Sequence, residues 1–484
     1  MHTGAALSRK KRVLLVYVTT SDSVFAASPY IKLSNFPQLG LLYLASLLRE
    51  AGYEPQYIDV SIGDITTAQI AASASRDDVL FVGFYSNVAF RDDICTRIEA
   101  IRNRSKVPVV VGGPGFVEAI HYFNAGANAI VAGEAEDFIV EIARRIEDGR
   151  SLGGLPGVLL PGEGTGEDME VAPPTRNLDA LPRPAWDLAP PRLFVNKLGL
   201  FNRHPFYTMT ASRGCHSRCA FCFQIYRDSS DRRYRIRSVD NVIDEMVALH
   251  RAYKIKHIRF QDEAFGANRD WMEDFCRRLI AEKLPVTWNC SLYPWFFQKN
   301  AEPMLKLIRR SGCVCIHFGL QSATPEILKR VHRSPKEPAI LMEIIPKMKR
   351  MGFYTIVDFI YGLPGETEET MRNNLRFAIA CKTHMAQSSA LKLGPRIPIY
   401  AEYGDNPVCD LTDEQINAGI ARARRAFFAR PKIHIETLAY ILRHNPAFLA
   451  SLIEVIPFGA RLALSKPRSD TWKYTRPFYR QEQN

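Results

Sequence analysis

The 484-residue sequence has no apolar run long enough to cross a bilayer, so it gives no sign of a transmembrane helix. The basic residues 1–12 lead into a short apolar run at 13–18. That run is too brief for a secretory signal and lacks a small-residue cleavage site. We therefore expect a cytoplasmic protein.

Cysteine is also scarce, with 10 residues in the whole chain, which excludes a disulfide scaffold. Most of these cysteines are scattered, and we interpret them as small buried hydrophobic residues. The scattered set is Cys95, Cys276, Cys290, Cys313, Cys315, Cys381 and Cys409. The other three, Cys215, Cys219 and Cys222, lie within eight residues.

Basic residues outnumber acidic ones, giving a net charge of +12, but no nucleic-acid-binding motif accompanies them. They are spread along the chain, with local clusters at 232–237 and 422–425. The charge therefore indicates a solvated basic surface, and we expect no nucleic-acid partner.

Residues 10–150 alternate short β-rich runs with amphipathic helical patterns, which predicts an α/β fold with a doubly wound parallel sheet of flavodoxin or Rossmann type. Its ligand crevice should lie at the carboxyl ends of the strands. The expected strands are 13–18, 56–60, 79–84, 109–111 and 129–132, and the expected helices are 38–51, 90–102, 117–123 and one from 136.

Residues 151–200 lose this periodicity and are rich in glycine and proline, which predicts a linker along the surface. A second alternating series over 201–400 predicts a partial (β/α)6 barrel of TIM-like type, with its active site at the carboxyl ends of the strands. Its expected strands are 207–211, 257–261, 286–290, 314–319, 354–360 and 388–393, and its expected helices are 239–253, 271–282, 340–351 and 368–383. Residues 401–484 form a predicted C-terminal helical region, with helices at 413–428 and 435–464 and a polar tail.

The three clustered cysteines follow the first predicted barrel strand with the spacing C-x3-C-x2-C. Thiolates are the ligands of iron–sulfur clusters, and three of them can hold a 4Fe-4S cube while leaving its fourth iron open. The alternative is zinc, which prefers two cysteine pairs or a Cys/His set. His216 is poorly placed to complete such a set, and no second cysteine pair lies nearby.

The cysteine spacing, the aromatic Phe221 before the last cysteine and the predicted barrel resemble the radical S-adenosylmethionine superfamily. The resemblance implies that Cys215, Cys219 and Cys222 hold the cluster, and that S-adenosylmethionine chelates the open iron and is split reductively to a 5′-deoxyadenosyl radical. It also implies that Phe221 lies against the adenine, although a loop aromatic packed on the barrel mouth would fit the same position.

Further barrel-end motifs agree with this family. The resemblance assigns Asp262 and Glu263, after the second strand, to the methionyl amino group, although either could be a solvated helix cap. Gln321 and Ser322 follow the fourth strand; relatives usually carry Glu at the first of these positions, which supplies a charge that Gln321 lacks. Gly362 belongs to a fifth-strand motif at 358–366, where glycine lets the backbone approach the ligand.

The amino-terminal domain resembles the cobalamin-binding domain of one radical S-adenosylmethionine subfamily, on the motifs at 38–45, 110–114, 132–137 and 181–188. The resemblance implies that the loops after the third, fourth and fifth strands bind cobalamin. The residues concerned are Ser86, Asn87, Gly112, Gly113, Pro114, Gly133 and Glu134. No Asp-x-His-x-x-Gly motif is present to supply a histidine to cobalt, so the fold without the ligand is the alternative.

Together these resemblances imply an enzyme that uses the cluster, S-adenosylmethionine and cobalamin to modify an unactivated carbon, and we favour methyl transfer. Oxidative cyclisation or ring rearrangement is the alternative, and a non-catalytic corrinoid or metal carrier is an alternative of another class. We expect a small-molecule substrate and an electron donor such as flavodoxin or ferredoxin. The apolar stretch 438–462 predicts a cap on the barrel, or else a membrane-surface contact or a cover for a lipid-like substrate.

Overall fold

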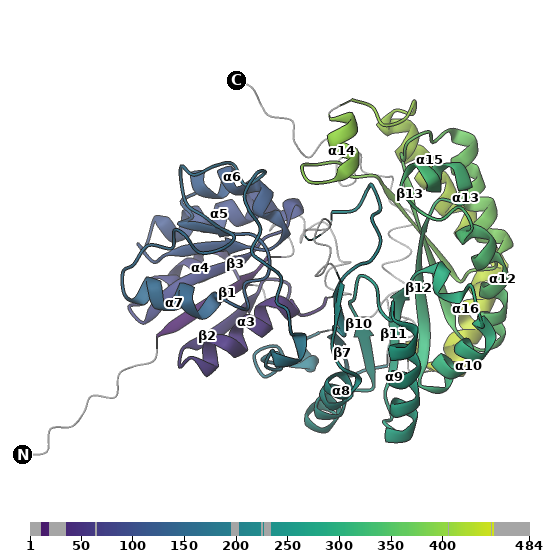
Figure 1. Cartoon of the computed structure of the whole chain (residues 1–484), viewed down its shortest axis with the longest axis horizontal. Coiled ribbons are helices and arrows are strands. Elements are labelled where there is room, and N and C mark those ends of the chain that lie inside the picture. Colours follow the sequence, from purple (N-terminus) through teal and green to yellow (C-terminus); the bar gives the residue numbers. More distant parts are fainter. Residues whose placement is uncertain are drawn as a thin grey trace, which may run out of the picture. The chain divides into compact units, whose positions relative to one another are not determined.

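The computed structural model describes residues 11–18, 35–62, 65–194, 203–223, 226, 234–404, 406–446 and 448–449, and these form two compact units, Met1–Val195 and Asn196–Asn484 (Figure 1). Each unit has its own sheet and its own core. No helix in the described part of the chain combines the length and the apolar character that a bilayer crossing needs.

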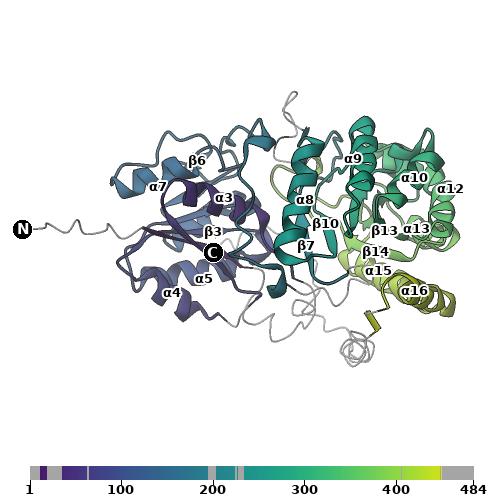
Figure 2. The ribbon, with the colours of Figure 1, turned by 90° about the horizontal axis from the view of Figure 1, so that it is seen from below.

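The first unit contains a six-stranded sheet in the order β2-β1-β3-β4-β5-β6, which is parallel except for β6. Helices cover both faces, with α3 and α7 on one side and α4 and α5 on the other (Figure 2). The strands are β1 (Arg12–Tyr17), β2 (Glu54–Asp59), β3 (Val79–Tyr85), β4 (Val109–Gly112), β5 (Ala129–Val131) and β6 (Val158–Leu159). The helices are α3 (Leu39–Glu50), α4 (Thr67–Ala74), α5 (Arg91–Arg102), α6 (Ala119–Asn124) and α7 (Ile139–Glu147), with short 3-10 turns at Val88–Phe90 and Pro114–Glu118.

The predicted doubly wound sheet is confirmed, and its first five strands follow the flavodoxin-like order 2-1-3-4-5. Helix α3 ends where Gly52, with φ of +93°, reverses the chain as expected of a residue after a helix. Helix α4 was not predicted. It is short and alanine-rich, and it begins with a capping box between Thr66 and Gln69.

The prediction that 151–200 is a surface linker is wrong for much of this segment. Strand β6 extends the sheet antiparallel to β5, and Leu152, Leu155 and Ala172 belong to the core of the first unit. Ala185 N donates to Leu42 O, which fixes the segment on α3. The apolar residues stand singly between Gly and Pro, so they form no periodic pattern that sequence reasoning could detect.

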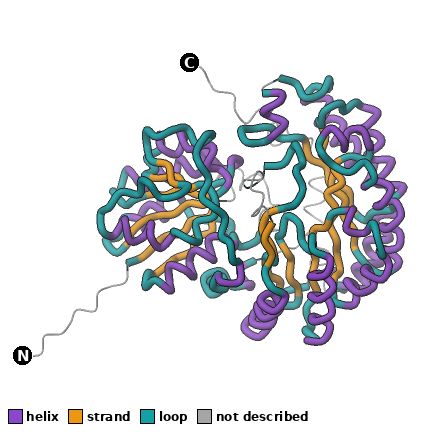
Figure 3. Tube along the Cα trace, viewed as in Figure 1, coloured by secondary structure: helices purple, strands orange, loops and turns teal. Residues whose placement is uncertain are grey.

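The second unit is an open parallel sheet in the order β14-β13-β12-β11-β10-β7, with helices along its outer face (Figure 3). Its strands are β7 (Phe206–Met209), β10 (His257–Phe260), β11 (Thr287–Leu292), β12 (Cys313–Gln321), β13 (Tyr354–Tyr361) and β14 (Met385–Ala390), and a separate hairpin pairs β8 (Ser212–Gly214) with β9 (Tyr234–Ile236). The helices are α8 (Val239–Tyr253), α9 (Arg269–Glu282), α10 (Ala301–Arg310), α11 (Pro325–Arg330), α12 (Glu337–Arg350), α13 (Glu368–Ala380), α14 (Pro398–Tyr403), α15 (Asp413–Phe428) and α16 (Pro431–His444), with a 3-10 turn at Pro294–Phe297. The two other 3-10 turns, Leu178–Ala180 and Pro191–Leu193, belong to the first unit.

The predicted partial (β/α)6 barrel is confirmed, and α8 and α15 have the predicted ends. Strand β14 begins three residues earlier than predicted, because Gln387 and Ser389 are polar and its apolar pattern starts late. Helices α10, α11 and α14 were not predicted.

The C-terminal helix α16 packs against the amino-terminal end of the barrel strands. The Tyr440 hydroxyl donates to Val314 O at 3.0 Å, and its ring packs with Cys315 and Tyr354. The predicted cap on the barrel is therefore confirmed for this part of the stretch. The rest of the predicted helix, from residue 450, and the polar tail lie outside the described residues.

Candidate active site

The three clustered cysteines lie on the loop that follows β7 and the first arm of the β8–β9 hairpin. Cys215 and Cys219 are buried, with 6% and 5% of their surface exposed, whereas Cys222 is exposed. Gly214, with φ of +79°, turns the chain from β8 into the loop. The loop thus begins at the carboxyl end of the first barrel strand, as predicted.

Asp262, at the end of β10, fixes the start of this loop. Its buried carboxylate accepts hydrogen bonds from Ala211 N at 3.1 Å and from Ser212 N and Ser212 Oγ at 2.5 Å. Burial raises the pKa of Asp262 to about 6, although these hydrogen bonds oppose the shift. The resemblance implies that Asp262 lies near the methionyl amino group, and this stays a prediction. In the structure both of its oxygens hold the backbone that leads to Cys215.

Arg237, after β9, secures the same backbone from the other side. Its guanidinium donates to Thr210 O at 2.8 Å and forms a buried ion pair with Glu245 of α8 at 2.5 Å. The Arg237 carbonyl in turn accepts from the indole of Trp271 at 2.8 Å. Hydrogen bonds and an ion pair of Arg237 therefore connect α8 and α9 to the turn before the cysteines.

Tyr293, after β11, contacts the first cysteine. Its hydroxyl lies 2.9 Å from Cys215 Sγ, and Ser217 N donates to the same sulfur at 3.3 Å. Burial, and next the neighbouring Cys215, raise the pKa of Tyr293, so the hydroxyl keeps its proton at neutral pH. Tyr293 is therefore placed to donate a hydrogen bond to a thiolate at this position.

Arg333, after α11, contacts the second cysteine. Its guanidinium lies 3.7 Å from Cys219 Sγ, donates to Gly319 O at 2.6 Å and forms a buried ion pair with Glu337 at 2.5 Å. It also lies over the Tyr293 ring, 5.3 Å from the centroid. Burial raises the pKa of the Cys219 thiol, and the positive charge of Arg333 opposes that shift.

Phe221 packs at the barrel mouth against an apolar cluster that includes Ile327 and Leu363, and Ile360 packs against the same cluster. The loop backbone is held by two hydrogen bonds of Ala220, from its N to Val331 O at 3.1 Å and from Ile399 N to its carbonyl at 3.0 Å. The predicted contact of Phe221 with adenine stays a prediction, and the packing confirms that this aromatic belongs to the mouth.

The chemistry of this loop fits an iron–sulfur cluster better than a zinc ion. Within the described residues, no three His, Cys, Asp or Glu side chains come close enough to hold a single metal ion. The ring of His216, the histidine considered as a zinc ligand, packs on the ring of Tyr234, with 4.3 Å between the centroids. The charge of Arg333 favours the thiolate form of Cys219, and thiolates are the ligands of iron–sulfur clusters. The residues present could therefore hold the cluster.

The other residues assigned to S-adenosylmethionine lie on three loops at the same ends of the strands. Glu263 is exposed beside Asp262. Gln321 has φ of +72°, and its amide nitrogen lies 2.5 Å from the position that a Cβ on Gly319 would take. Ser322 is fully buried, and its hydroxyl accepts from Thr324 N at 3.2 Å.

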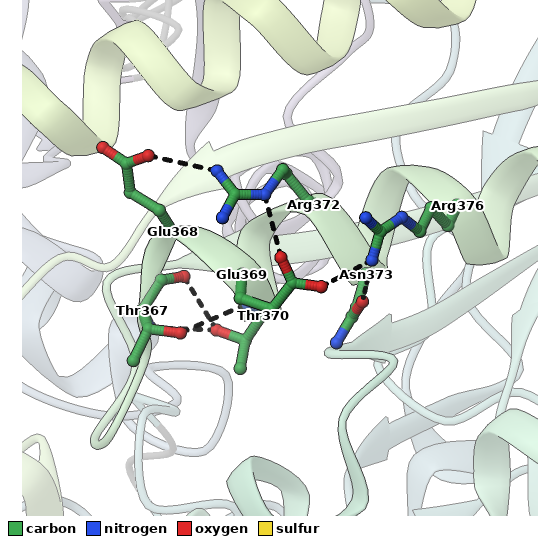
Figure 4. A network of polar contacts seen from close by, with 7 residues as sticks. All are labelled: Thr367, Glu368, Glu369, Thr370, Arg372, Asn373 and Arg376. Carbon is green, nitrogen blue, oxygen red and sulfur yellow. Dashed lines mark hydrogen bonds and ion pairs between the residues drawn. The ribbon is translucent and has the colours of Figure 1, made fainter.

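Gly362 ends β13 with φ of +86°, and its N donates to the buried Glu366 carboxylate. Helix α13 begins directly after this turn with a capping box between Thr367 and Thr370. Its first turn carries an exposed network in which Glu369 pairs with Arg372 at 3.0 Å and with Arg376 at 2.5 Å (Figure 4). Such exposed ion pairs contribute little stability individually. The capping box is therefore what fixes the start of α13 directly after the fifth-strand motif.

In the first unit, Ser86 joins the ends of β3 and β4. Ser86 N and Ser86 Oγ donate to Gly112 O at 2.6 and 2.9 Å, and Gly115 N donates to Ser86 O at 3.2 Å. Gly113 has φ of +91°, and a Cβ there would meet Ser86 O at 2.7 Å. The structure thus gives the buried Ser86 a local role in holding the turn, and Gly113 is required by close backbone contact.

The remaining residues assigned to cobalamin lie around this turn and after β5. Asn87 is exposed, Pro114 is half-buried, and Gly133 has φ of +102°. Glu134 accepts a hydrogen bond from Thr175 N at 3.1 Å, which comes from the segment predicted as a linker. All of them lie at the carboxyl end of the parallel sheet, as predicted.

Sequence reasoning missed several residues at the two sheets' carboxyl ends. Tyr293 and Arg333 carry no motif of their own, and only the fold brings them to the cysteines. In the first unit, Tyr57 donates to Asp59 at 2.8 Å and accepts from Gln38 N at 3.1 Å, so the start of α3 is tied to the end of β2. The position of Tyr293 after a predicted strand was the available signal.

Two family models match the chain, the Radical SAM superfamily over residues 209–378 and the B12 binding domain over residues 33–143. The uncharacterized methyltransferase PH0819 of Pyrococcus horikoshii is 30% identical over 424 residues, which are 83% of this chain and 90% of that protein. The anaerobic magnesium-protoporphyrin IX monomethyl ester cyclase of Cereibacter sphaeroides is 25% identical, over 77% of this chain and 61% of the cyclase.

Among solved structures, the fold is similar to that of the radical S-adenosylmethionine methyltransferase TsrM from Kitasatospora setae, with cobalamin and a [4Fe-4S] cluster bound. The TM-score is 0.63 at 21% identity, covering 81% of this chain and 74% of TsrM. At this identity the similarity concerns the fold.

Proposed function

Because the chain belongs to the radical S-adenosylmethionine enzymes that carry an amino-terminal cobalamin-binding domain, we propose that it transfers a methyl group to an unactivated carbon of a small-molecule substrate. The cofactors of this family are a 4Fe-4S cluster, S-adenosylmethionine and cobalamin. When bound, they supply the electron that splits the sulfonium and the methyl group that is transferred, and the protein supplies orientation and exclusion of water.

The observation that carries this proposal is the cysteine loop. Two of its sulfurs are buried at the carboxyl end of a barrel strand, where Tyr293 and Arg333 offer a hydrogen-bond donor and a positive charge. The charge of Arg333 favours the thiolate form of Cys219, which a cluster needs. We propose that Cys215, Cys219 and Cys222 are the cluster ligands, and that Asp262 and Arg237 act as positioning residues for their loop.

We further propose that Phe221, Glu263, Gln321, Ser322 and Gly362 contact S-adenosylmethionine. Their loops end adjacent parallel strands, so they meet at one edge of the sheet. For cobalamin we propose the loops after β3, β4 and β5, with Ser86, Asn87, Gly112, Gly113, Pro114, Gly133 and Glu134. Glycines with positive φ in these loops leave the backbone open to a bulky nucleotide tail.

The experiment is anaerobic reconstitution with iron, sulfide and cobalamin, followed by reductant and S-adenosylmethionine. We expect 5′-deoxyadenosine, accompanied by S-adenosylhomocysteine when the substrate is methylated. Cys219→Ala should abolish 5′-deoxyadenosine formation, whereas the buried Cys276→Ala, outside the loop, is the matched control. Unchanged 5′-deoxyadenosine formation by Cys219→Ala would contradict the cluster assignment.

Oxidative cyclisation is the second candidate, favoured by the similarity to the cyclase of Cereibacter sphaeroides. The same products separate the two reactions. Methyl transfer consumes a second S-adenosylmethionine and releases S-adenosylhomocysteine, whereas cyclisation releases 5′-deoxyadenosine without it. A substrate-dependent 5′-deoxyadenosine yield with no S-adenosylhomocysteine would favour the cyclase.

We propose a flavodoxin or ferredoxin as electron donor, a cytoplasmic location, and a peripheral membrane contact through α16. The contact is supported by the exposed apolar side chains of Ile435, Leu438 and Leu442, which lie on one stripe of the helix. Co-sedimentation with anionic liposomes tests it. Loss of binding in the triple serine variant supports the contact, and equal, negligible binding of both proteins contradicts it.

A further inference from the structure

The inner face of the barrel sheet carries a cluster of polar side chains, of which only Asp358, the first residue of the fifth-strand motif, belongs to a cofactor motif. It comprises Arg259 on β10, His317 on β12 and Asp358 on β13. Asp358 lies two residues from Ile360, which packs against the same apolar cluster at the mouth as Phe221 does. His317 lies two residues from Cys315, which packs with Tyr440. Both side chains therefore face the inside of the barrel, between the mouth and the α16 cap.

Arg259 shares this face. In the sheet register it is paired with Asn289 of β11, and Asn289 is paired with Cys315 of β12. Partners in a parallel register project to the same side of a sheet. Strands β10, β12 and β13 thus each contribute a polar side chain to the same face of the sheet, with β11 lying between β10 and β12. In an ordinary barrel this interior is filled by branched apolar residues.

Two atoms of this group are shielded from water without a partner. His317 Nδ1 lies 3.9 Å from Asp358 Oδ2, which is longer than a hydrogen bond. His317 Nε2 and Asp358 Oδ1 are buried, and no hydrogen bond reaches either of them from the described residues. Buried polar atoms are normally satisfied, because leaving them without a partner is costly. His317 Nε2 and Asp358 Oδ1 are therefore both available to form a hydrogen bond with a ligand.

The charge of the group is positive on balance near neutral pH. Burial, and next the charge of Arg259, lower the pKa of His317 to about 4, so the ring is neutral. Burial raises the pKa of Asp358 to about 7, although Arg259 opposes the shift, so this carboxyl is only partly ionised. Arg259 itself stays charged, because a guanidinium does not lose its proton in proteins. An anion is the ligand that this balance favours.

We propose that Arg259, His317 and Asp358 form a binding site on the inner face of the barrel for an oxyanion group of the substrate, either a carboxylate or a phosphate. This inference rests on the proposed function in one respect, that the ligand is the molecule to be modified. Arg259 supplies the charge and two parallel donors. His317 orients the bound group, and Asp358 weakens binding when it is ionised.

Binding is tested by 19F NMR on the holoprotein in its oxidised state, without reductant. The probes are 4-fluorobenzoate, 4-fluorophenyl phosphate, 4-fluorobenzylamine and 4-fluorobenzyl alcohol. We expect saturable binding of one or both anions, which identifies the oxyanion, and none of the amine or alcohol. Saturating S-adenosylmethionine should leave the bound anion in place. Displacement by S-adenosylmethionine, binding of the amine, or binding of neither anion would overturn the inference.

Two variants give effects of opposite sign. Arg259→Gln should weaken anion binding by about tenfold or more, because a charge-assisted contact is lost. Asp358→Asn should strengthen it several-fold, because the competing negative charge is removed. The matched control is Arg277→Gln, an arginine on α9 with 69% of its side chain exposed, which should change nothing.

Arg259→Gln and Asp358→Asn are tested together so that the inference can still be decided if one of them does not fold. If Arg259→Gln does not fold, Asp358→Asn alone decides, and unchanged or weaker binding overturns the inference. Because no reductant is present, the measurement is independent of S-adenosylmethionine cleavage. A protein that binds the anion but forms no 5′-deoxyadenosine therefore contradicts the proposed function and leaves this site intact.

Discussion

The hydroxyl of Tyr293 lies 2.9 Å from Cys215 Sγ, although 77 residues separate them along the chain. The contact joins the loop after β11 to the loop after β7. It places a proton donor on the sulfur of the first cysteine. Hydrogen bonds to cluster sulfurs are among the factors that set reduction potential, so this contact has a measurable consequence.

Tyr293→Phe should lower the reduction potential of the cluster, because one hydrogen bond to Cys215 is removed. A net hydrogen bond of about 1 kcal/mol corresponds to roughly 40 mV for one electron. The measurement is a potentiometric titration followed by electron paramagnetic resonance. Tyr440→Phe is the control, since it removes a buried hydroxyl contact of the same unit at the α16 cap. A shift of equal size in both variants would contradict the role of Tyr293.

Arg333→Met should destabilise the barrel unit by about 3–5 kcal/mol, because Glu337 is left as a buried charge without its partner. The double variant Arg333→Met with Glu337→Leu should recover most of this loss. It should nevertheless hold less iron and sulfide, because Cys219 has lost the positive charge that favours its thiolate. Thermal unfolding and iron analysis measure the two effects separately. Full cluster content in the double variant would contradict the proposed effect on Cys219.

Asp262→Ala should destabilise the barrel unit by about 2–4 kcal/mol, because the backbone N–H groups of Ala211 and Ser212 lose their acceptor. The loop before Cys215 should loosen, and cluster content should fall with it. The exposed Asp274→Ala on α9 should change stability by less than about 0.5 kcal/mol. Calorimetry and iron analysis check both variants. Stability equal to that of the control would rule out the positioning role.

Gly113→Ala should destabilise the first unit by about 1–3 kcal/mol, because its positive φ is unfavourable for alanine and the new Cβ would meet Ser86 O. Cobalamin binding, followed by absorbance, should weaken as the turn between β4 and α6 shifts. Gly149→Ala is a useful control, since Gly149 also has positive φ but nothing lies within 4 Å of an added Cβ. Equal losses of stability in both variants would mean that the positive φ alone causes the effect, and would contradict a role for the contact with Ser86 O.

Anion binding to the inner face of the barrel should strengthen as the pH falls from 8 to 6. Asp358 has a pKa raised to about 7, so falling pH removes its negative charge and leaves Arg259 less compensated. The groups that face it are His317 on β12, which is neutral in this range, Arg259 on β10 and the uncharged Gln387 on β14. The affinity of 4-fluorobenzoate, whose own carboxylate is ionised throughout this range, measures the effect. In Asp358→Asn the dependence should disappear.

The polar interior of the barrel illustrates why some features escaped sequence reasoning. Arg259, His317 and Asp358 occur in three different predicted strands. Alternation indicates which residues share a face within one strand. It does not give the register between strands, on which the grouping depends.

The segment 151–200, which was predicted to be a linker, shows a second limit of prediction from sequence. Periodicity is the signal for regular structure, and the segment from 151 has none. Yet Leu152 and Leu155 fill the core of the first unit, because packing depends on where an apolar side chain arrives and not on its pattern in the sequence.

The sequence by itself determined the two α/β units, the succession of most of their strands along the chain and the cysteine spacing. These follow from local periodicity and from residues close together in the chain. Only the tertiary structure decided that Asp262 holds the loop backbone, that Tyr293 and Arg333 reach Cys215 and Cys219, and that three strands share a polar interior. Those relationships join residues 41 to 114 positions apart, and the parallel sheet brings them together by aligning strands that the sequence keeps separate.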